Sequence, residues 1–238
     1  VKKHGDKAVI NSEKKFSNFN IKSKIIKFSN EEINKISKGI DKKLKKSIDL
    51  AYLRIKQFHS KQKFFSFKFK DRYNNELAYK YTPIEKVGVY VPGGTASYPS
   101  TVLMNCIPAI VAGVKNIYLT TPVLCNPINP GVIYAAKKCG VKEIYKTGGA
   151  HSIAALTYGT KTFKKVDKIV GPGNTYVDMA KQMVYGTVDI DKPAGPSEVC
   201  VYIEDIKYSS FAAAELLAQC EHDPQATVVA ISPNITIL

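Results

Sequence analysis

The spacing of apolar residues changes character near Lys86. Before that point the chain is polar and helical, and apolar residues recur every three or four positions from Ile33 to Phe58, which predicts amphipathic helices with one packed face. Ser29 or Asn30, followed by glutamates, is a typical helix start. Residues 64–81 then alternate apolar and polar side chains, which predicts an antiparallel hairpin. This lead-in shows no pattern that points to chemistry.

From Lys86 onward, short apolar runs alternate with longer amphipathic segments. The predicted strands are residues 86–91, 116–120, 143–145, 168–170, 199–203 and 227–231. The predicted helices are residues 99–113, 130–139, 150–158, 174–185 and 209–221. This alternation is typical of βαβ units on a mostly parallel sheet, so we expect an α/β fold preceded by a helical lead-in.

Three glycine-rich turns follow predicted strands. They are Gly93–Gly94, Gly148–Gly149 and Gly171-Pro172-Gly173, and none has the G-x-G-x-x-G spacing of a dinucleotide fingerprint. In parallel sheets, ligands bind beyond the carboxyl ends of the strands. Glycine turns are common in such loops, yet three at corresponding positions also suit a nucleotide or phosphate site. The pattern alone leaves both interpretations open.

Composition narrows the class of protein. The chain has 238 residues, of which 45% are hydrophobic, enough for one large domain or two modest ones. It contains no run of eighteen or more apolar residues and no signal-peptide pattern, so we expect no membrane association and a cytoplasmic location, or the plastid stroma in a plant or alga. The five cysteines form no C-x-x-C pair, which argues against a disulfide scaffold and a cysteine-built zinc site.

The chain is strongly basic, with a net charge of +15. A basic α/β module without catalytic activity that binds nucleic acid is therefore an alternative function. The lysines concentrate before Lys86, however, and the sequence shows no arginine cluster and no helix-turn-helix or RNA-binding signature. A lysine-rich solvated surface is the favoured interpretation, so we expect no nucleic-acid partner.

Six segments carry a resemblance to a known family. They occur in fixed order: Tyr90-Val-Pro-Gly-Gly94, Pro99-Ser-Thr-Val-Leu-Met104, Gly148-Gly-Ala150, Val166-Asp-Lys-Ile-Val-Gly-Pro-Gly-Asn174, Asp191-Lys-Pro-Ala-Gly-Pro-Ser-Glu198 and Leu217-Ala-Gln-Cys-Glu-His222. Together these segments closely resemble the histidinol dehydrogenases, the zinc- and NAD-dependent enzymes that complete histidine biosynthesis. The resemblance is strong from Lys86 onward and weak before it.

The resemblance implies a fold, an activity and an assembly. It implies incomplete Rossmann-like domains in a homodimer that oxidises L-histidinol to L-histidine through histidinal and reduces two NAD molecules. On this basis we expect residues 1–89 to contribute a helical lead-in and hairpin to the first Rossmann-like domain. Residues 90–196 would form the second, NAD-binding domain, and residues 197–238 would return to the first.

The resemblance also assigns individual residues. Tyr90 and Asn174 match NAD-contacting positions, Ser197 matches a substrate-contacting serine, and Gln219 and His222 match zinc ligands that also touch substrate. From the residues alone, simpler roles remain open. A tyrosine ending a strand suits core packing, an asparagine after glycines suits a helix cap, a serine suits a turn, and a glutamine and histidine three apart suit one face of a helix.

Two departures from the family pattern stand out. The family usually has glutamine after Gly-Gly-Ala, where it touches NAD, and this chain has His151, which we retain as an NAD-binding candidate. The family's remaining zinc ligands and its Glu-His acid/base pair have no counterpart before Leu238. The sequence also starts at Val1 rather than methionine. We therefore expect a partial chain that contains no catalytic acid/base residue and is inactive alone.

Overall fold

A computed structural model of the chain describes residues 1–17, 26–93, 98–123, 128–193, 198–222 and 226–237, with the backbone alone at His222. The chain forms two compact units, Val1–Pro193 (unit 1) and Ala194–Leu238 (unit 2), and each is described by itself. The division of unit 1 into a lead-in and an NAD-binding domain near residue 89 stays a prediction.

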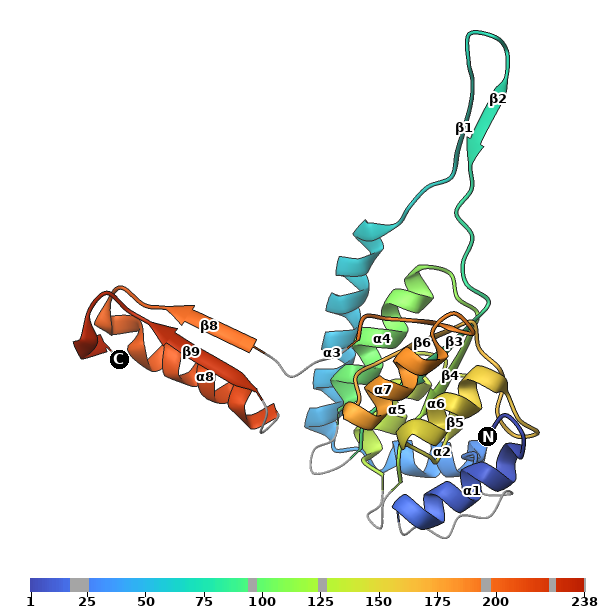
Figure 1. Cartoon of the computed structure of the whole chain (residues 1–238), viewed down its shortest axis with the longest axis horizontal. Helices are drawn as coiled ribbons and strands as arrows, with labels where there is room; N and C mark the ends of the chain where they lie inside the picture. Colours follow the sequence, from blue (N-terminus) through green and yellow to red (C-terminus); the bar gives the residue numbers. More distant parts are fainter. Residues whose placement is uncertain (18–25, 94–97, 124–127, 194–197, 223–225, 238) are drawn as a thin grey trace. The chain divides into compact units, whose positions relative to one another are not determined.

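A five-stranded parallel sheet lies at the centre of unit 1 (Figure 1). Its order is β5-β4-β3-β6-β7, with every neighbouring pair parallel. The strands are β3 (Lys86–Tyr90), β4 (Asn116–Thr120), β5 (Glu143–Tyr145), β6 (Lys168–Val170) and β7 (Asp189–Ile190). Strands β3, β4 and β5 lie in sequence order from the middle of the sheet to one edge. The chain then crosses back, so that β6 pairs with β3 on its other side.

Helices cover both faces of this sheet. One apolar layer joins the sheet to α2 (Asn30–Lys38), α3 (Lys42–His59), α4 (Pro99–Val111) and α5 (Pro130–Lys138). The other joins it to α1 (Gly5–Phe16), α6 (Gly149–Tyr158) and α7 (Thr175–Val184). Side chains of β3 alternate between the layers, with Val89 in the first and Tyr90 in the second. A sheet buried on both faces explains its continuous Val and Ile runs.

Local sequence signals set the helix ends. Ser29 caps α2 through a reciprocal capping box with Glu32, and Asp41 accepts hydrogen bonds from the first turn of α3. Residues 39–41 therefore break the long amphipathic pattern into two helices. The predicted packed face is confirmed at Ile48, which is buried, whereas Phe58 at its far end is exposed.

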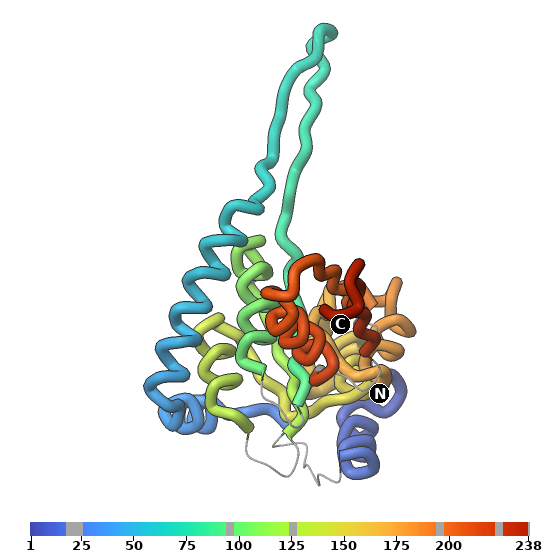
Figure 2. Tube along the Cα trace, turned by 90° about the vertical axis from the view of Figure 1, so that its left-hand side faces the viewer, coloured from blue at the N-terminus to red at the C-terminus, as the bar shows by residue number. Residues whose placement is uncertain are grey.

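The predicted hairpin consists of β1 (Phe67–Lys70) and β2 (Glu76–Tyr79), which pair antiparallel. It follows the short 3-10 helix η2 (Ser60–Gln62) and projects away from the sheet of unit 1 in both views (Figures 1 and 2). All eight strand residues are exposed. The alternating pattern therefore predicts the pairing correctly, but neither face of this ribbon contacts a core.

Unit 2 is a single βαβ unit. Strand β8 (Glu198–Tyr202) pairs parallel with β9 (Thr227–Ile231), and α8 (Ser209–His222) connects them, with short 3-10 helices η3 (Ile206–Tyr208) and η4 (Ile235–Ile237). The predicted α/β fold with parallel βαβ units is confirmed in both units. The two-residue strand β7 was not predicted, because a strand this short carries no periodic signal.

Candidate functional site

The strand order places the glycine turns at one edge of the sheet. Strands β3 and β6 are neighbours, although the chain leaves β3 in the direction of β4 and reaches β6 only after β5. This reversal is a topological switch point, and in open α/β sheets ligands bind beyond the carboxyl ends of the strands at such a point. The turns that begin at Gly93 and Gly171 follow these two strands. Gly94 lies outside the described residues.

The Gly171 turn packs directly against β3. Gly171 has a φ of +114°, and a Cβ at this position would lie 2.1 Å from the carbonyl oxygen of Tyr90. No other residue type fits this contact without moving the strand. The Gly171 N–H donates to Asp191 (2.7 Å), and its carbonyl accepts from the buried Lys181 Nζ (3.0 Å). Lys181 and Asp191 also form an ion pair, so both backbone groups of the turn are fixed.

Asn174 begins helix α7 at the end of this turn. Its side-chain oxygen accepts a hydrogen bond from the Val177 N–H (3.1 Å), so the residue is an N-cap. The helix-cap role that the sequence suggests for Asn174 is therefore observed. Asn174 is also exposed at the carboxyl edge of the sheet. It stands at the N-terminus of α7, the end of a helix that favours anionic and polar ligands.

Tyr90 is buried at the end of β3, on the side of the sheet covered by α6. Its hydroxyl oxygen accepts a hydrogen bond from the Gly149 N–H (3.2 Å). Burial raises the pKa of this hydroxyl, so Tyr90 is a neutral phenol that retains a proton to donate. The side chain thus connects the end of β3 to the glycine turn after β5.

His151 lies in the first turn of α6, directly after the Gly148–Gly149 turn. Its Nε2 is 2.8 Å from an oxygen of Glu13, a residue of α1. The same oxygen accepts hydrogen bonds from the Gly148 N–H (3.0 Å) and the Thr147 hydroxyl. One ring nitrogen of His151 is therefore already engaged within the protein.

Glu13 is almost completely buried, with 1% of its surface exposed. Burial alone would raise the pKa of its carboxyl group, but hydrogen bonds from His151, Thr147 and Gly148 outweigh burial and hold the pKa below its ordinary value. Glu13 is therefore an anion at the N-terminus of α6, where the helix dipole favours negative charge. Glu13 lies in the polar lead-in, where no sequence pattern points to chemistry. The available signal was its spacing of four from buried Val9 on α1.

The other predicted residues belong to unit 2. Gln219 lies in the last turn of α8, three residues before His222, which ends that helix, so the two positions are on the same face of the helix. The His222 side chain and all of Ser197 lie outside the described residues. Within the described part of the chain, no three His, Cys, Asp or Glu side chains form a group that could hold a metal. The assignment of Gln219 and His222 as zinc ligands therefore stays a prediction.

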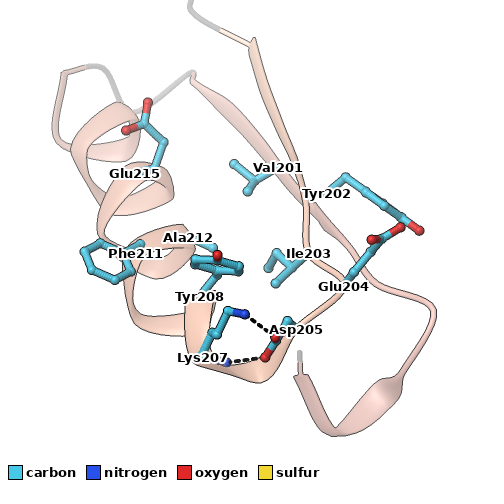
Figure 3. Close-up of a pocket in the computed structure, with 10 residues that line it drawn as sticks. All are labelled: Val201, Tyr202, Ile203, Glu204, Asp205, Lys207, Tyr208, Phe211, Ala212 and Glu215. Atoms are coloured by element: carbon cyan, nitrogen blue, oxygen red, sulfur yellow. Dashed lines mark hydrogen bonds and ion pairs between the residues drawn. The ribbon is translucent and has the colours of Figure 1, made fainter.

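A hollow of about 700 Å³ lies between β8 and the start of α8 in unit 2 (Figure 3). Val201 and Ile203 point from the strand toward the helix, whereas Tyr202 and Glu204 point to the other side of the strand. None of the predicted site residues lines this hollow.

The arrangement in unit 1 defines a class of protein. Its parallel sheet is covered by helices on both faces, and glycine turns and an asparagine-capped helix meet at the switch point. Doubly wound α/β proteins with this geometry bind nucleotide cofactors at the carboxyl edge. No helix in the described part of the chain is long and apolar enough to cross a bilayer.

Comparison with known proteins identifies the family. The family model for histidinol dehydrogenase matches residues 1–238, and the chain belongs to this family. It is 51% identical over 239 residues to the histidinol dehydrogenase of Pelagibacter ubique, covering 100% of this chain and 55% of that protein. It is 47% identical over 232 residues to that of Carboxydothermus hydrogenoformans, covering 98% and 55%.

A solved structure supports the same assignment. The crystal structure of histidinol dehydrogenase from Elizabethkingia anophelis aligns with a TM-score of 0.90 and 41% identity, covering 98% of this chain and 54% of that one. The chain spans about half the length of the curated relatives it matches. The family resemblance predicted from the sequence is confirmed. Nothing in these comparisons supports the alternative of a nucleic-acid-binding module.

Proposed function

We propose that the full-length protein oxidises L-histidinol to L-histidine, with NAD as the oxidant. Membership of the histidinol dehydrogenase family over residues 1–238 is the observation that carries this proposal. The switch point in unit 1, flanked by the turns that begin at Gly93 and Gly171, supports an NAD site. Tyr90, Asn174 and His151 are the proposed NAD-binding residues. The assembly we propose is a homodimer, and because the named relatives are bacterial, its proposed location is the cytoplasm.

The substrate and metal site is proposed to include unit 2. Gln219 and His222 would hold zinc and, with Ser197, contact histidinol. When bound, zinc supplies a Lewis acid that orients the alcohol and polarises its oxygen. Within the chain, α8 presents Gln219 and His222 one turn apart, so that both can approach one ion. The acid/base residues of the reaction have no proposed position in this chain.

The described residues of unit 1 would orient the cofactor. The paired hydrogen bonds on Gly171 fix the start of α7, which sets the position of Asn174. The Tyr90 hydroxyl accepts a hydrogen bond from the Gly149 N–H and so helps to fix the Gly148–Gly149 turn. Such fixed polar groups lower the entropy lost when a cofactor is aligned for hydride transfer.

The test uses purified full-length protein loaded with zinc. Histidinol is oxidised first to the aldehyde and then, with water supplying the second oxygen, to the acid, so each molecule should yield two NADH. We expect chelation to abolish the reaction and added zinc to restore it. The Gln219→Ala variant should lose activity, whereas substitution of Lys207, which lines the hollow of unit 2, should not change it. A zinc-loaded protein that leaves histidinol unchanged would refute the proposed function.

A further inference from the structure

We propose that Glu13 is a positioning residue for NAD, acting through the Gly148–Gly149 turn and His151. This inference rests on the proposed function, because it assumes that NAD binds at the carboxyl edge of the sheet. Glu13 itself lies on α1 and is buried, so it does not reach a ligand directly. Its effect would be exerted through the backbone and side chains that it holds.

The hydrogen bonds around Glu13 converge from one short segment. A single oxygen accepts from the Thr147 hydroxyl, the Gly148 N–H and His151 Nε2. These three donors surround the Gly148–Gly149 turn, at the N-terminus of α6. Because the carboxylate is buried, loss of its charge would leave donors without a strong acceptor in a site with little access to water. The conformation of the turn therefore depends on a residue more than 130 positions away, as the separation of 135 between Glu13 and Gly148 shows.

Glu13 also determines what His151 can offer to a cofactor. The side chain of His151 is only 10% exposed, and its Nε2 faces Glu13. A Cβ on Gly149 would lie 3.5 Å from the ring atom Nδ1, so the ring packs over the turn itself. The imidazole and the carboxylate therefore form one unit that fixes the turn. In this chain the position where the family usually has glutamine is occupied by an anchored ring.

Helix α1 supplies a matched control. Asp6 is seven residues before Glu13, on the same side of α1, and its carboxylate accepts hydrogen bonds from the hydroxyls of Thr160 and Thr162, beyond the C-terminal end of α6. Two carboxylates thus attach α1 to opposite ends of α6. Asp6→Asn should weaken the attachment of α1 as Glu13→Gln does, but without touching the glycine turn.

The experiment measures NAD binding to the full-length protein by calorimetry, together with melting temperature. We expect Glu13→Gln to weaken NAD binding about tenfold, since a hydrogen-bonded charge is lost, while Asp6→Asn stays within about twofold of wild type. In steady-state assays the KM for NAD should rise in Glu13→Gln, with the KM for histidinol unchanged. If Glu13→Gln does not fold, Thr147→Val takes its place, with an expected weakening of about threefold.

Two results would overturn the role of Glu13. One is NAD affinity that stays unchanged in the Glu13→Gln or Thr147→Val variant. The other is an equal loss of affinity in Asp6→Asn, which would make the effect a general consequence of loosening α1. A wild-type protein that binds NAD but does not oxidise histidinol refutes the proposed function alone, and the comparison of Glu13 with Asp6 can still be made.

Discussion

We expect the Asp191→Asn substitution to destabilise unit 1 more than any exposed charge change nearby. Asp191 pairs with Lys181, whose side chain is 2% exposed, and both hold the Gly171 turn. Asparagine can still accept from the Gly171 N–H, so the change mainly removes the charge that balances a buried ammonium group. Breaking a buried pair costs about 3–5 kcal/mol. Because Asp191 is 31% exposed, we expect the lower end, about 3 kcal/mol.

Urea unfolding followed by circular dichroism measures this loss, and the chain supplies a matched control. Asp189, two residues before Asp191, pairs with Lys168 at 2.5 Å, but its side chain is 50% exposed, so Asp189→Asn should cost less than about 1 kcal/mol. Adding Lys181→Met to Asp191→Asn removes the unbalanced charge and should recover about 2 kcal/mol. If Asp191→Asn costs no more than Asp189→Asn, the buried pair does not stabilise the turn.

Three further predictions follow from other contacts. Gly171→Ala should lower the free energy of unfolding by about 3 kcal/mol or more, because the new Cβ would overlap a carbonyl oxygen of β3. Gly186 also has a positive φ, +90°, but a Cβ there would meet no atom within 4 Å. Gly186→Ala should therefore cost only about 1–2 kcal/mol of backbone strain in the same urea assay. Ser29→Ala should lower stability by about 1 kcal/mol through loss of a capping box, while Ser47→Ala on the surface of α3 should be neutral by thermal melting. The pKa of the Glu13 carboxyl is lower in the folded protein than its ordinary value of 4.5. The ionised carboxylate therefore stabilises the fold fully above pH 4.5, and this stabilisation is lost as the pH falls through the folded pKa. Wild type should thus lose more stability than Glu13→Gln on acidification below pH 4.5. Equal acid sensitivity of the two proteins in urea titrations would contradict this.

Local signals were sufficient for most of the secondary structure. The apolar runs from Lys86 onward predicted the parallel strands, and Ser29 and Asn174 predicted helix starts that the structure confirms. These features depend on residues within one or two turns of each other, so a single sequence contains the information. The resemblance to a family was equally accessible, because it rests on short motifs in fixed order.

The strand order and the buried charges could not be predicted in this way. That β6 returns to pair with β3 depends on contacts between segments about 80 residues apart, which periodicity does not record. The contact of Glu13 with residues 147–151 is of the same kind. A glutamate in a polar helix has the same local pattern whether its carboxylate faces water or a glycine turn. The roles of Tyr90, His151, Asn174, Gln219 and His222 toward ligands stay predictions.

The buried charges of unit 1 explain how the chain can carry His151, where the family usually has glutamine, and still keep the Gly148–Gly149 turn. Lys181 and Asp191 hold the backbone of the Gly171 turn, and Glu13 holds that of the Gly148 turn, so neither turn depends on a ligand for its shape. A histidine in place of glutamine would be unfavourable in a buried position without a partner for its ring nitrogens. Glu13 supplies that partner at 2.8 Å. The consequence of His151 should therefore be understood together with Glu13, because replacing Glu13 leaves the His151 ring without its buried partner, whereas replacing His151 removes one of three hydrogen bonds to the same carboxylate oxygen.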